Sequence, residues 1–375
     1  MSRRIAAKDI PELTALRIIA AACVVVSHLH ALGMVSAPVL HQILDGGRPA
    51  VCFFFVLSGF IMQHNYPLLD AKDSAATKRY AQSRFARLYP TMLLSLGLSV
   101  PTVIYLLRIQ AHSQLLQYYA LQSHYSFWLV MSGVAQLLVL TGWTPAAAIN
   151  QPWNGPAWSL SCEFFFYASF PFLRPFLQRL SSRRMIVALI VAWLLQGAWI
   201  VMIGALAAPN RSSFLIYQFP LTHLFEFASG VCGGILTTRL DARQVRILIA
   251  STAVTAVVAF TMLHLWNTTM PDSYGITPLF LALIIATTQS SGSRWFAPLR
   301  SRAALALGHA SYALYITHIP ILIGASVFGV ASGIGWFWVP ILMAGSLVVH
   351  YGYAEPVRRL LLRPASLSPA VALRQ

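Results

Sequence analysis

Arg17 and His28 lie in one apolar run of the sequence, from Leu13 to Leu32. A charged side chain inside a membrane-spanning segment is costly, so it is rarely kept without a function. The two residues are eleven apart, which on a helix is three turns plus about 20°, so both side chains lie on one face. At a rise of ~1.5 Å per residue they stand ~16 Å apart along the axis. This helix is therefore predicted to form one wall of an active-site channel.

Two further arginines occur together in the string R-F-A-R-L-Y-P, at the start of a later apolar segment. Arg84 and Arg87 are three residues apart, so on a helix they project from neighbouring positions. Planar guanidinium groups match phosphate oxygens, which makes Arg17, Arg84 and Arg87 candidate ligands of a phosphorylated substrate. Anchoring at the membrane surface is the alternative for Arg84 and Arg87.

His28 is the candidate general base, because an imidazole titrates near neutral pH and can take a proton from a hydroxyl. Glu163, in the string W-S-L-S-C-E-F-F-F-Y, is the second candidate catalytic residue. An intramembrane carboxylate needs a partner or a water-filled cavity, so it is expected to orient a base, bind an acceptor hydroxyl or pair with an arginine. His223 and Glu226 are three apart and are interpreted as a structural pair or as support for a site.

The weaker substrate-binding candidates have structural alternatives. Asp45 lies in a D-G-G turn, where it orients a histidine, binds substrate or is simply solvated. Aromatic side chains suit either a membrane-interface belt or stacking on a sugar. The candidates of this kind, together with one further histidine, are Trp153, Trp158, Tyr312 and His318. The four cysteines lie in apolar segments without metal-ligand spacing, so no metal is expected.

The composition places these residues in a membrane protein. The 375 residues are 57% hydrophobic and only 10% charged, whereas soluble domains average about 25% charged. A net charge of +16 would suggest nucleic acid as the partner of a soluble protein. Here the basic residues lie between apolar runs, as topology signals do, so membrane lipid and not nucleic acid is the expected partner.

Eleven apolar segments are candidates for membrane spans. They lie at about 14–32, 48–66, 86–107, 127–142, 158–177, 185–206, 214–236, 246–266, 276–289, 303–325 and 334–354. If the short segment 127–142 does not cross, 23 of the 26 Lys and Arg fall on the cytoplasmic side, as the positive-inside rule requires. The three that remain outside are Arg48, Arg108 and Arg211.

The expected fold is thus an all-α polytopic membrane protein with about ten transmembrane helices and both termini in the cytoplasm. Segment 127–142 is expected to be re-entrant or interfacial on the outer face. The whole chain, 1–375, is expected to be one integral-membrane domain with its membrane core at about 13–354. In this topology Arg17 lies at the cytoplasmic end of the first helix, whereas His28, Glu163 and His318 lie in the outer halves of their helices.

Five strings, in this order, match one family together. They are the first-span L-R with a histidine eleven residues after the arginine, F-F-V-L-S-G-F, R-F-A-R-L-Y-P, W-S-L-S-C-E-F-F-F-Y-A-S-F-P and S-Y-A-L-Y-I-T-H-I-P. The chain therefore resembles the type 3 membrane acyltransferases, which acylate bacterial surface sugars and some small molecules. It looks like a stand-alone member, without the fused soluble esterase-like domain that some members carry.

The resemblance implies a cytoplasmic acyl-CoA donor, with acetyl as the expected group, and a hydroxyl acceptor on a glycan or related molecule. It implies that His28 is the catalytic base, that Arg17, Arg84 and Arg87 serve the donor, and that Glu163 is functional. It also implies a bacterial inner-membrane location. A transporter of an anionic solute, using the intramembrane Arg, Glu and His residues, is the alternative, although no inverted repeat is visible. The acceptor, the acyl chain, a covalent acyl-enzyme and the oligomeric state stay open.

Overall fold

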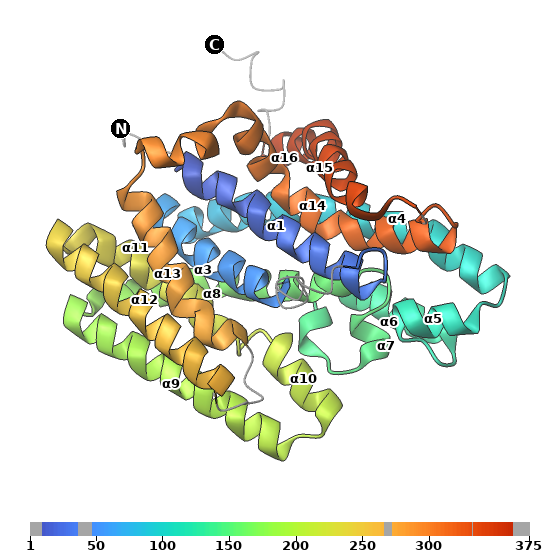
Figure 1. Cartoon of the computed structure of the whole chain (residues 1–375), viewed down its shortest axis with the longest axis horizontal. Coiled ribbons are helices and arrows are strands. Elements are labelled where there is room, and N and C mark those ends of the chain that lie inside the picture. Colours follow the sequence, from blue (N-terminus) through green and yellow to red (C-terminus); the bar gives the residue numbers. More distant parts are fainter. Residues whose placement is uncertain (1–9, 37–46, 266–271, 332, 363–375) are drawn as a thin grey trace, which may run out of the picture.

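The computed structural model describes residues 10–36, 47–265, 272–331 and 333–362 (Figure 1). Within these ranges every regular element is a helix, and no strand occurs. This confirms the all-α class. The longer helices are α1 (Pro11–Ala31), α3 (Gly47–Asn65), α4 (Ser74–Arg108), α8 (Trp158–Arg179), α9 (Ser182–Leu206), α11 (Leu224–Arg239), α12 (Ala242–Leu265), α13 (Asp272–Gln289), α14 (Arg302–Val327) and α15 (Trp338–Val349).

The shorter elements connect or extend these helices. They are α5 (His112–Tyr119), α6 (Tyr125–Leu137), α7 (Ala147–Asn150), α10 (Pro209–Tyr217) and α16 (Glu355–Leu361), with a 3₁₀ turn at Arg294–Arg300 after α13. A π-helical turn, His350–Ala354, joins α15 to α16. Single π-helical turns are rare in helices and are frequent at functional sites.

Among the described residues, six helices are long and apolar enough to cross a membrane, and a seventh candidate is the pair Tyr274–Gln289 and Arg294–Arg300, which is bent by 98°. The prediction of about ten crossings with both termini in the cytoplasm therefore stays a prediction. Helix α6, in the segment expected not to cross, has 13 residues. At ~1.5 Å per residue it measures ~20 Å, which is shorter than a hydrocarbon core of about 30 Å.

The segment 214–236, expected as one span, is divided into α10 and α11. The break contains Pro220, which has no backbone N–H to continue a helix. Side chains donate hydrogen bonds to backbone carbonyl oxygens near this break. The Gln196 amide donates to Thr222 O over 2.9 Å, and the Thr222 hydroxyl donates to Leu215 O over 2.7 Å. Irregular backbone at membrane depth is tolerated where it is buried in protein or lines a cavity.

Close helix crossings hold the centre of the molecule together. Helix α3 packs on α11, and α1 packs on α14 (Figure 1). A Cβ at Gly230 of α11 would overlap the backbone carbonyl of Val56 in α3, and a Cβ at Gly308 of α14 would overlap the carbonyl of Thr14 in α1. Only glycine allows the backbones to approach this closely, so the relative positions of α1, α3, α11 and α14 are closely defined.

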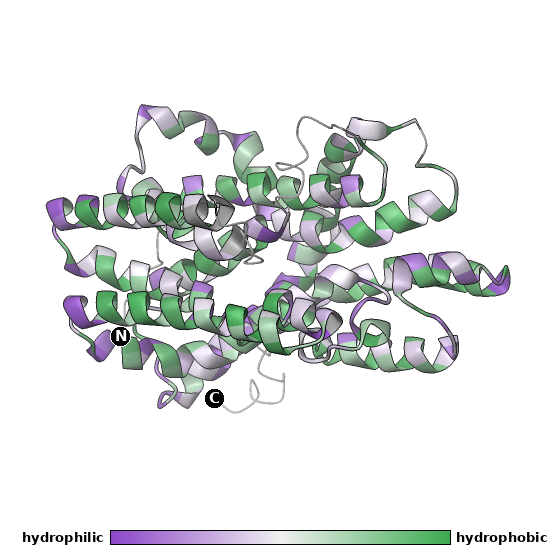
Figure 2. Ribbon diagram, turned by 60° about the horizontal axis from the view of Figure 1, so that its bottom comes forward, coloured by the Kyte–Doolittle hydropathy of each residue, from purple (hydrophilic) through white to green (hydrophobic). Residues whose placement is uncertain are grey.

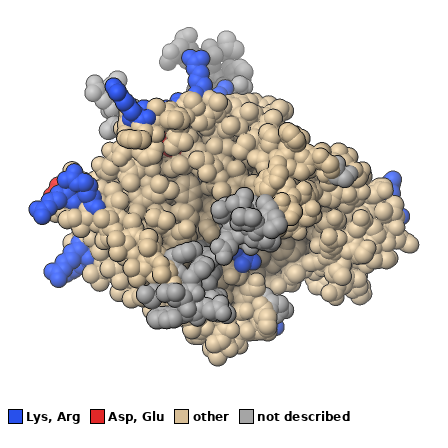
Figure 3. Space-filling model, in the orientation of Figure 1, with Lys and Arg blue, Asp and Glu red and all other residues tan. Residues whose placement is uncertain are grey.

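Hydropathy and charge are distributed as expected for a membrane protein. Figure 2 shows hydrophobic stretches along the long helices and hydrophilic residues at several of their ends. Figure 3 shows most of the visible Lys and Arg along the left and upper edges of one face, with few charged side chains over the rest of that face.

Candidate active site

Three cavities follow one another along α1. The basic vestibule is lined by Arg17, Arg84 and Arg87 among others, the central pocket by Arg17, Arg87 and Glu163, and the histidine vestibule by His28. The first two share the lining residues Arg17, Leu57, Ile61, Arg87 and Tyr312, and the last two share Val51 and Tyr315. Their empty volumes are about 1660, 710 and 1800 Å³ in that order, so the central pocket is the smallest of the three, and this row of adjacent cavities is called the path below.

Helix α1 presents one face to this path. Thr14 and Arg17 line the basic vestibule, whereas Val24, His28 and Ala31 line the histidine vestibule. These residues are three, four or seven positions apart in an uninterrupted helix, which is one or two turns, so their side chains lie on one side of it. Arg17 and His28 therefore face the same path from positions ~16 Å apart along the axis.

The basic vestibule is lined by arginine side chains from helices α1, α4 and α16, which lie far apart in the sequence. Its lining contains five arginines and one carboxylate, namely Arg17, Arg84, Arg87, Arg358, Arg359 and Glu355. Glu355 pairs with Arg359 over 2.8 Å and with Arg358 over 3.4 Å. The Arg84 guanidinium donates to the Tyr66 hydroxyl over 3.0 Å, which orients it. The excess of guanidinium groups makes this vestibule suitable for a polyanion such as a group of phosphates.

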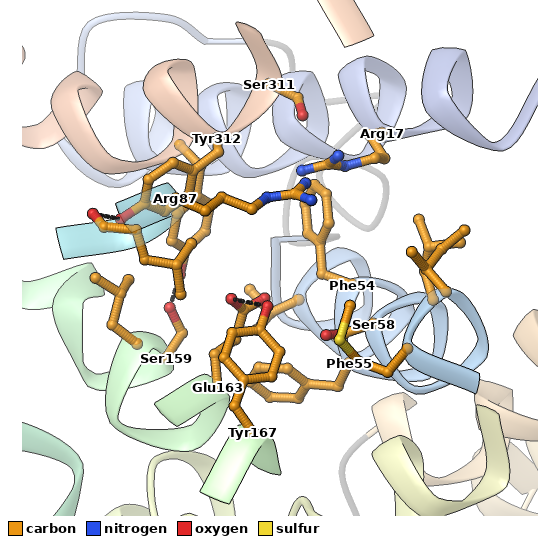
Figure 4. Close-up of a pocket in the computed structure, with 17 residues that line it drawn as sticks. Arg17, Phe54, Phe55, Ser58, Arg87, Ser159, Glu163, Tyr167, Ser311 and Tyr312 are labelled. Carbon is orange, nitrogen blue, oxygen red and sulfur yellow. Dashed lines mark hydrogen bonds between the residues drawn. The ribbon is translucent and has the colours of Figure 1, made fainter. Parts of the chain in front are cut away.

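In the central pocket two arginines face a carboxylate. Figure 4 shows the guanidinium groups of Arg17 and Arg87 close to each other, with Glu163 across the cavity. The Tyr167 hydroxyl donates to Glu163 over 3.0 Å. Among the ion pairs of the described residues, none joins Glu163 to Arg17 or Arg87 directly. The facing charges thus leave space between them for part of a ligand.

His28 lies at the far end of the path, beside a second imidazole. Its Nδ1 is 2.9 Å from Val24 O and 3.3 Å from Nε2 of His318. His318 is completely buried in α14, and its own Nδ1 is 2.6 Å from Tyr315 O. His28 lines the vestibule, whereas His318 is not among the lining residues of the three cavities. The sequence-predicted substrate-binding candidate His318 is thus placed behind His28.

The histidine vestibule has an aromatic and amide-bearing wall. The Arg48 guanidinium lies 3.8 Å above the centre of the Tyr217 ring, and both side chains line the cavity. Trp158, Gln151 and Gln218 line it as well. Arg48 was expected from the sequence only as a charge on the outer side, and Tyr217 was not predicted to be a site residue. Their contact joins α3 to the end of α10, and such a contact leaves no pattern in the local sequence.

Glu226 is the acceptor of a buried hydrogen-bond cluster below this wall. One of its oxygens accepts from the Gln196 amide over 3.1 Å, from His223 Nδ1 over 3.3 Å and from the Cys52 thiol over 3.9 Å. The ligand-type atoms of Cys52, His223 and Glu226 all lie within 4.8 Å of one another, so these residues are the candidate metal ligands in the described ranges. Three donors converge on one carboxylate oxygen, whereas Glu226 Oε2 and His223 Nε2 have no hydrogen-bond partner among the described residues.

The structure separates several residues that the sequence grouped together. Glu163, expected near the outer end of α1, shares the central pocket with Arg17 and shares no cavity with His28. Trp153 lines none of the three cavities, and its indole N–H donates to Leu129 O over 3.0 Å. The Tyr312 hydroxyl donates to Leu88 O over 2.8 Å while its ring lines the central pocket. Asp45 lies outside the described residues.

Comparison with known proteins identifies the family of this helical protein. The chain belongs to the acyltransferase domain family, whose sequence profile matches residues 10–354. It is 25% identical over 402 residues to acyltransferase MdmB of Streptomyces mycarofaciens, an alignment that covers 96% of this chain and 95% of that protein. No solved structure matches the chain. The family and the long apolar helices together identify an integral membrane protein with acyltransferase activity.

Proposed function

We propose that this protein transfers an acyl group, with acetyl as the expected group, from cytoplasmic acyl-CoA to a hydroxyl of a glycan or related acceptor. The observation that carries the proposal is the path along α1, which begins at a group of arginines and ends at His28. Acyl-CoA has a matching order of groups, because its negatively charged phosphates and its reactive thioester lie at opposite ends of a long flexible arm.

The donor would enter from the basic vestibule. Its phosphates would bind Arg84, Arg87 and Arg17, whose guanidinium groups can form paired hydrogen bonds to phosphate oxygens. The central pocket is lined by Phe54, Leu57 and other apolar side chains, so it suits the uncharged arm. The thioester would then reach the histidine vestibule, where Val51 and Tyr315 join the two cavities.

His28 would act as the general base for the acceptor hydroxyl. The hydroxyl proton moves to the imidazole, the oxygen bonds to the thioester carbonyl carbon, and the carbon–sulfur bond then breaks. The departing CoA thiolate takes the proton back, so the ester and free CoA leave with no net change in the enzyme. Holding both substrates in one path supplies much of the rate gain. Glu163 would balance the charge of Arg17 and Arg87 beside the arm.

The acceptor would bind in the histidine vestibule. Trp158 and Tyr217 offer aromatic faces, and Gln151 and Gln218 offer amide donors and acceptors. Aromatic rings with a few polar groups are typical of sites that bind polar ring compounds such as sugars. This favours a glycan or another hydroxyl-bearing ring compound as the acceptor. The protein itself is expected to lie in the bacterial inner membrane.

The proposal is tested with membranes that contain the protein, radiolabelled acetyl-CoA and separated envelope fractions. We expect donor-dependent label in one acceptor fraction and free CoA in equal amount. His28→Ala should lower the rate by about 10²- to 10⁴-fold, as expected for loss of a general base, while the variant still binds CoA.

His30→Ala is the matched control, because His30 lies on the same helix and lines none of the three cavities. The proposed function is wrong if no acyl-CoA gives label, whatever its chain length. Near-full activity of His28→Ala would show that His28 is not the base.

A further inference from the structure

Both ring nitrogens of His318 have a polar partner, and these partners determine which nitrogen carries hydrogen. It is fully buried in α14, at 0% exposure, directly behind His28. Its Nδ1 lies 2.6 Å from Tyr315 O, and its Nε2 lies 3.3 Å from Nδ1 of His28. The two rings meet edge to face with their centres 5.0 Å apart. The contact is formed across the α1–α14 interface, where Gly308 lies against the backbone of Thr14.

A carbonyl oxygen only accepts hydrogen bonds, so each nitrogen facing a carbonyl must be the donor. Nδ1 of His318 therefore carries hydrogen for Tyr315 O, and Nδ1 of His28 carries hydrogen for Val24 O, which is 2.9 Å away. A fully buried His318 would be costly as an imidazolium without a carboxylate partner, and among the described residues neither ring nitrogen contacts a carboxylate. Its Nε2 then holds a lone pair, which accepts from Nδ1 of His28.

We propose that His318 is a positioning residue, which keeps Nδ1 of His28 protonated and so leaves the Nε2 lone pair of His28 free for the acceptor hydroxyl. This inference rests on the proposed function of His28 as the base. The Nδ1–H of His28 has two acceptors, Val24 O and His318 Nε2. When Nε2 takes the hydroxyl proton, the same two acceptors stabilise the resulting imidazolium. His318 itself touches neither substrate.

Substituting His318 by Gln or by Asn distinguishes this positioning role from a purely structural one, because the two amides reach different partners. The amide of Gln extends about as far as Nε2 of a histidine, so His318→Gln places an acceptor near His28. The amide of Asn extends about as far as Nδ1, so His318→Asn keeps the bond to Tyr315 O and loses the contact with His28. Thr317→Val is the matched control, because Thr317 is a buried neighbour in α14 whose hydroxyl bonds only to Ala313 O among the described contacts.

The experiment measures label transfer from acetyl-CoA into the acceptor fraction with the full-length variants in membranes. We expect His318→Gln to keep kcat within about 10-fold of the unmutated protein and His318→Asn to lose about 10- to 100-fold, the range for supporting residues of this kind. The KM for acetyl-CoA should stay within about 2-fold in both. Equal losses in Gln and Asn, or a larger loss in Gln, would overturn the positioning role.

A second measurement uses the unmutated protein, in case both variants fail to fold. Diethyl pyrocarbonate modifies unprotonated imidazole nitrogens, and peptide masses locate the product. We expect modification of His28 with loss of transfer and no modification of His318. An unreactive His28 in active protein at neutral pH would contradict a free Nε2 lone pair. Failure of the proposed function is distinct, because then the unmutated protein transfers no label at all.

Discussion

Arg87 lines both the basic vestibule and the central pocket, so in the proposed binding mode it would contact the donor where the phosphates end and the arm begins. Arg87→Gln is expected to raise the KM for acetyl-CoA by about 10-fold or more, because a hydrogen bond to a charged group is worth about 1.5–3 kcal/mol. Initial rates at varied acetyl-CoA concentration measure the change.

The control for this substitution is Arg79→Gln. Arg79 is exposed on the same helix and lines none of the three cavities, so its replacement should leave the KM for acetyl-CoA unchanged. Equal KM values in all three proteins would remove Arg87 from the donor site. Equal increases in the two variants would indicate a general charge effect at the membrane surface.

Replacing Glu163 is expected to strengthen the binding of CoA, whereas replacing Arg87 is expected to weaken it. It faces Arg17 and Arg87 across the central pocket and accepts a hydrogen bond from Tyr167. Glu163→Gln keeps an acceptor for Tyr167 but removes the negative charge opposite the two arginines. CoA, which is an anion, should therefore bind several-fold more tightly to the variant, while the transfer rate falls. Calorimetric titration of the purified protein with CoA measures the affinity, and weaker binding would contradict the charge-balancing role.

At the scale of elements, the crossing of α3 and α11 decides whether the site is assembled. Gly230→Ala places a methyl group against the Val56 carbonyl, which belongs to backbone and cannot rotate away. The helices must separate, at a cost typical of overpacking, about 1–3 kcal/mol. We expect a lower melting temperature for the purified variant, followed by fluorescence during heating.

Gly204→Ala is the control at this scale. Gly204 lies in α9 with no atom near the position of an added Cβ, so alanine should be neutral or slightly stabilising, because alanine is the better helix former. A Gly230→Ala protein as stable as the Gly204→Ala protein would show that the α3–α11 crossing tolerates a wider separation.

At the scale of the whole molecule, the charge distribution predicts the orientation in the membrane. Exposed Ser113 follows the outer Arg108, whereas exposed Gln178 belongs to the segment counted as cytoplasmic. A membrane-impermeant maleimide should label Ser113→Cys in intact cells and Gln178→Cys only after the cells are opened. The parent protein carries Cys23→Ser, because Cys23 is exposed and the other cysteines are buried. The reverse labelling pattern would contradict the predicted topology.

The helices of this protein were predictable because hydropathy and helical spacing are local properties. Each of the eleven apolar segments contains helix, and the common face of Arg17 and His28 follows from eleven steps along one uninterrupted helix. The break in 214–236 was missed although Pro220 marked it. Its polar groups are satisfied by Gln196 from another helix, and a single segment carries no sign of such a contact.

What the sequence by itself determined is the all-helical class, the spacing of Arg17 and His28, and the pairing of Arg84 with Arg87, since each depends only on near neighbours in the chain. Tertiary structure alone decided which helices share a cavity. Glu163 lines the same cavity as Arg17 and not that of His28, and His318 lies behind His28. Both placements depend on how helices far apart in the sequence pack, and on where along their lengths they cross. At the α1–α14 crossing, Gly308 has no room for a Cβ and lets the two helices approach closely, which hydropathy does not report.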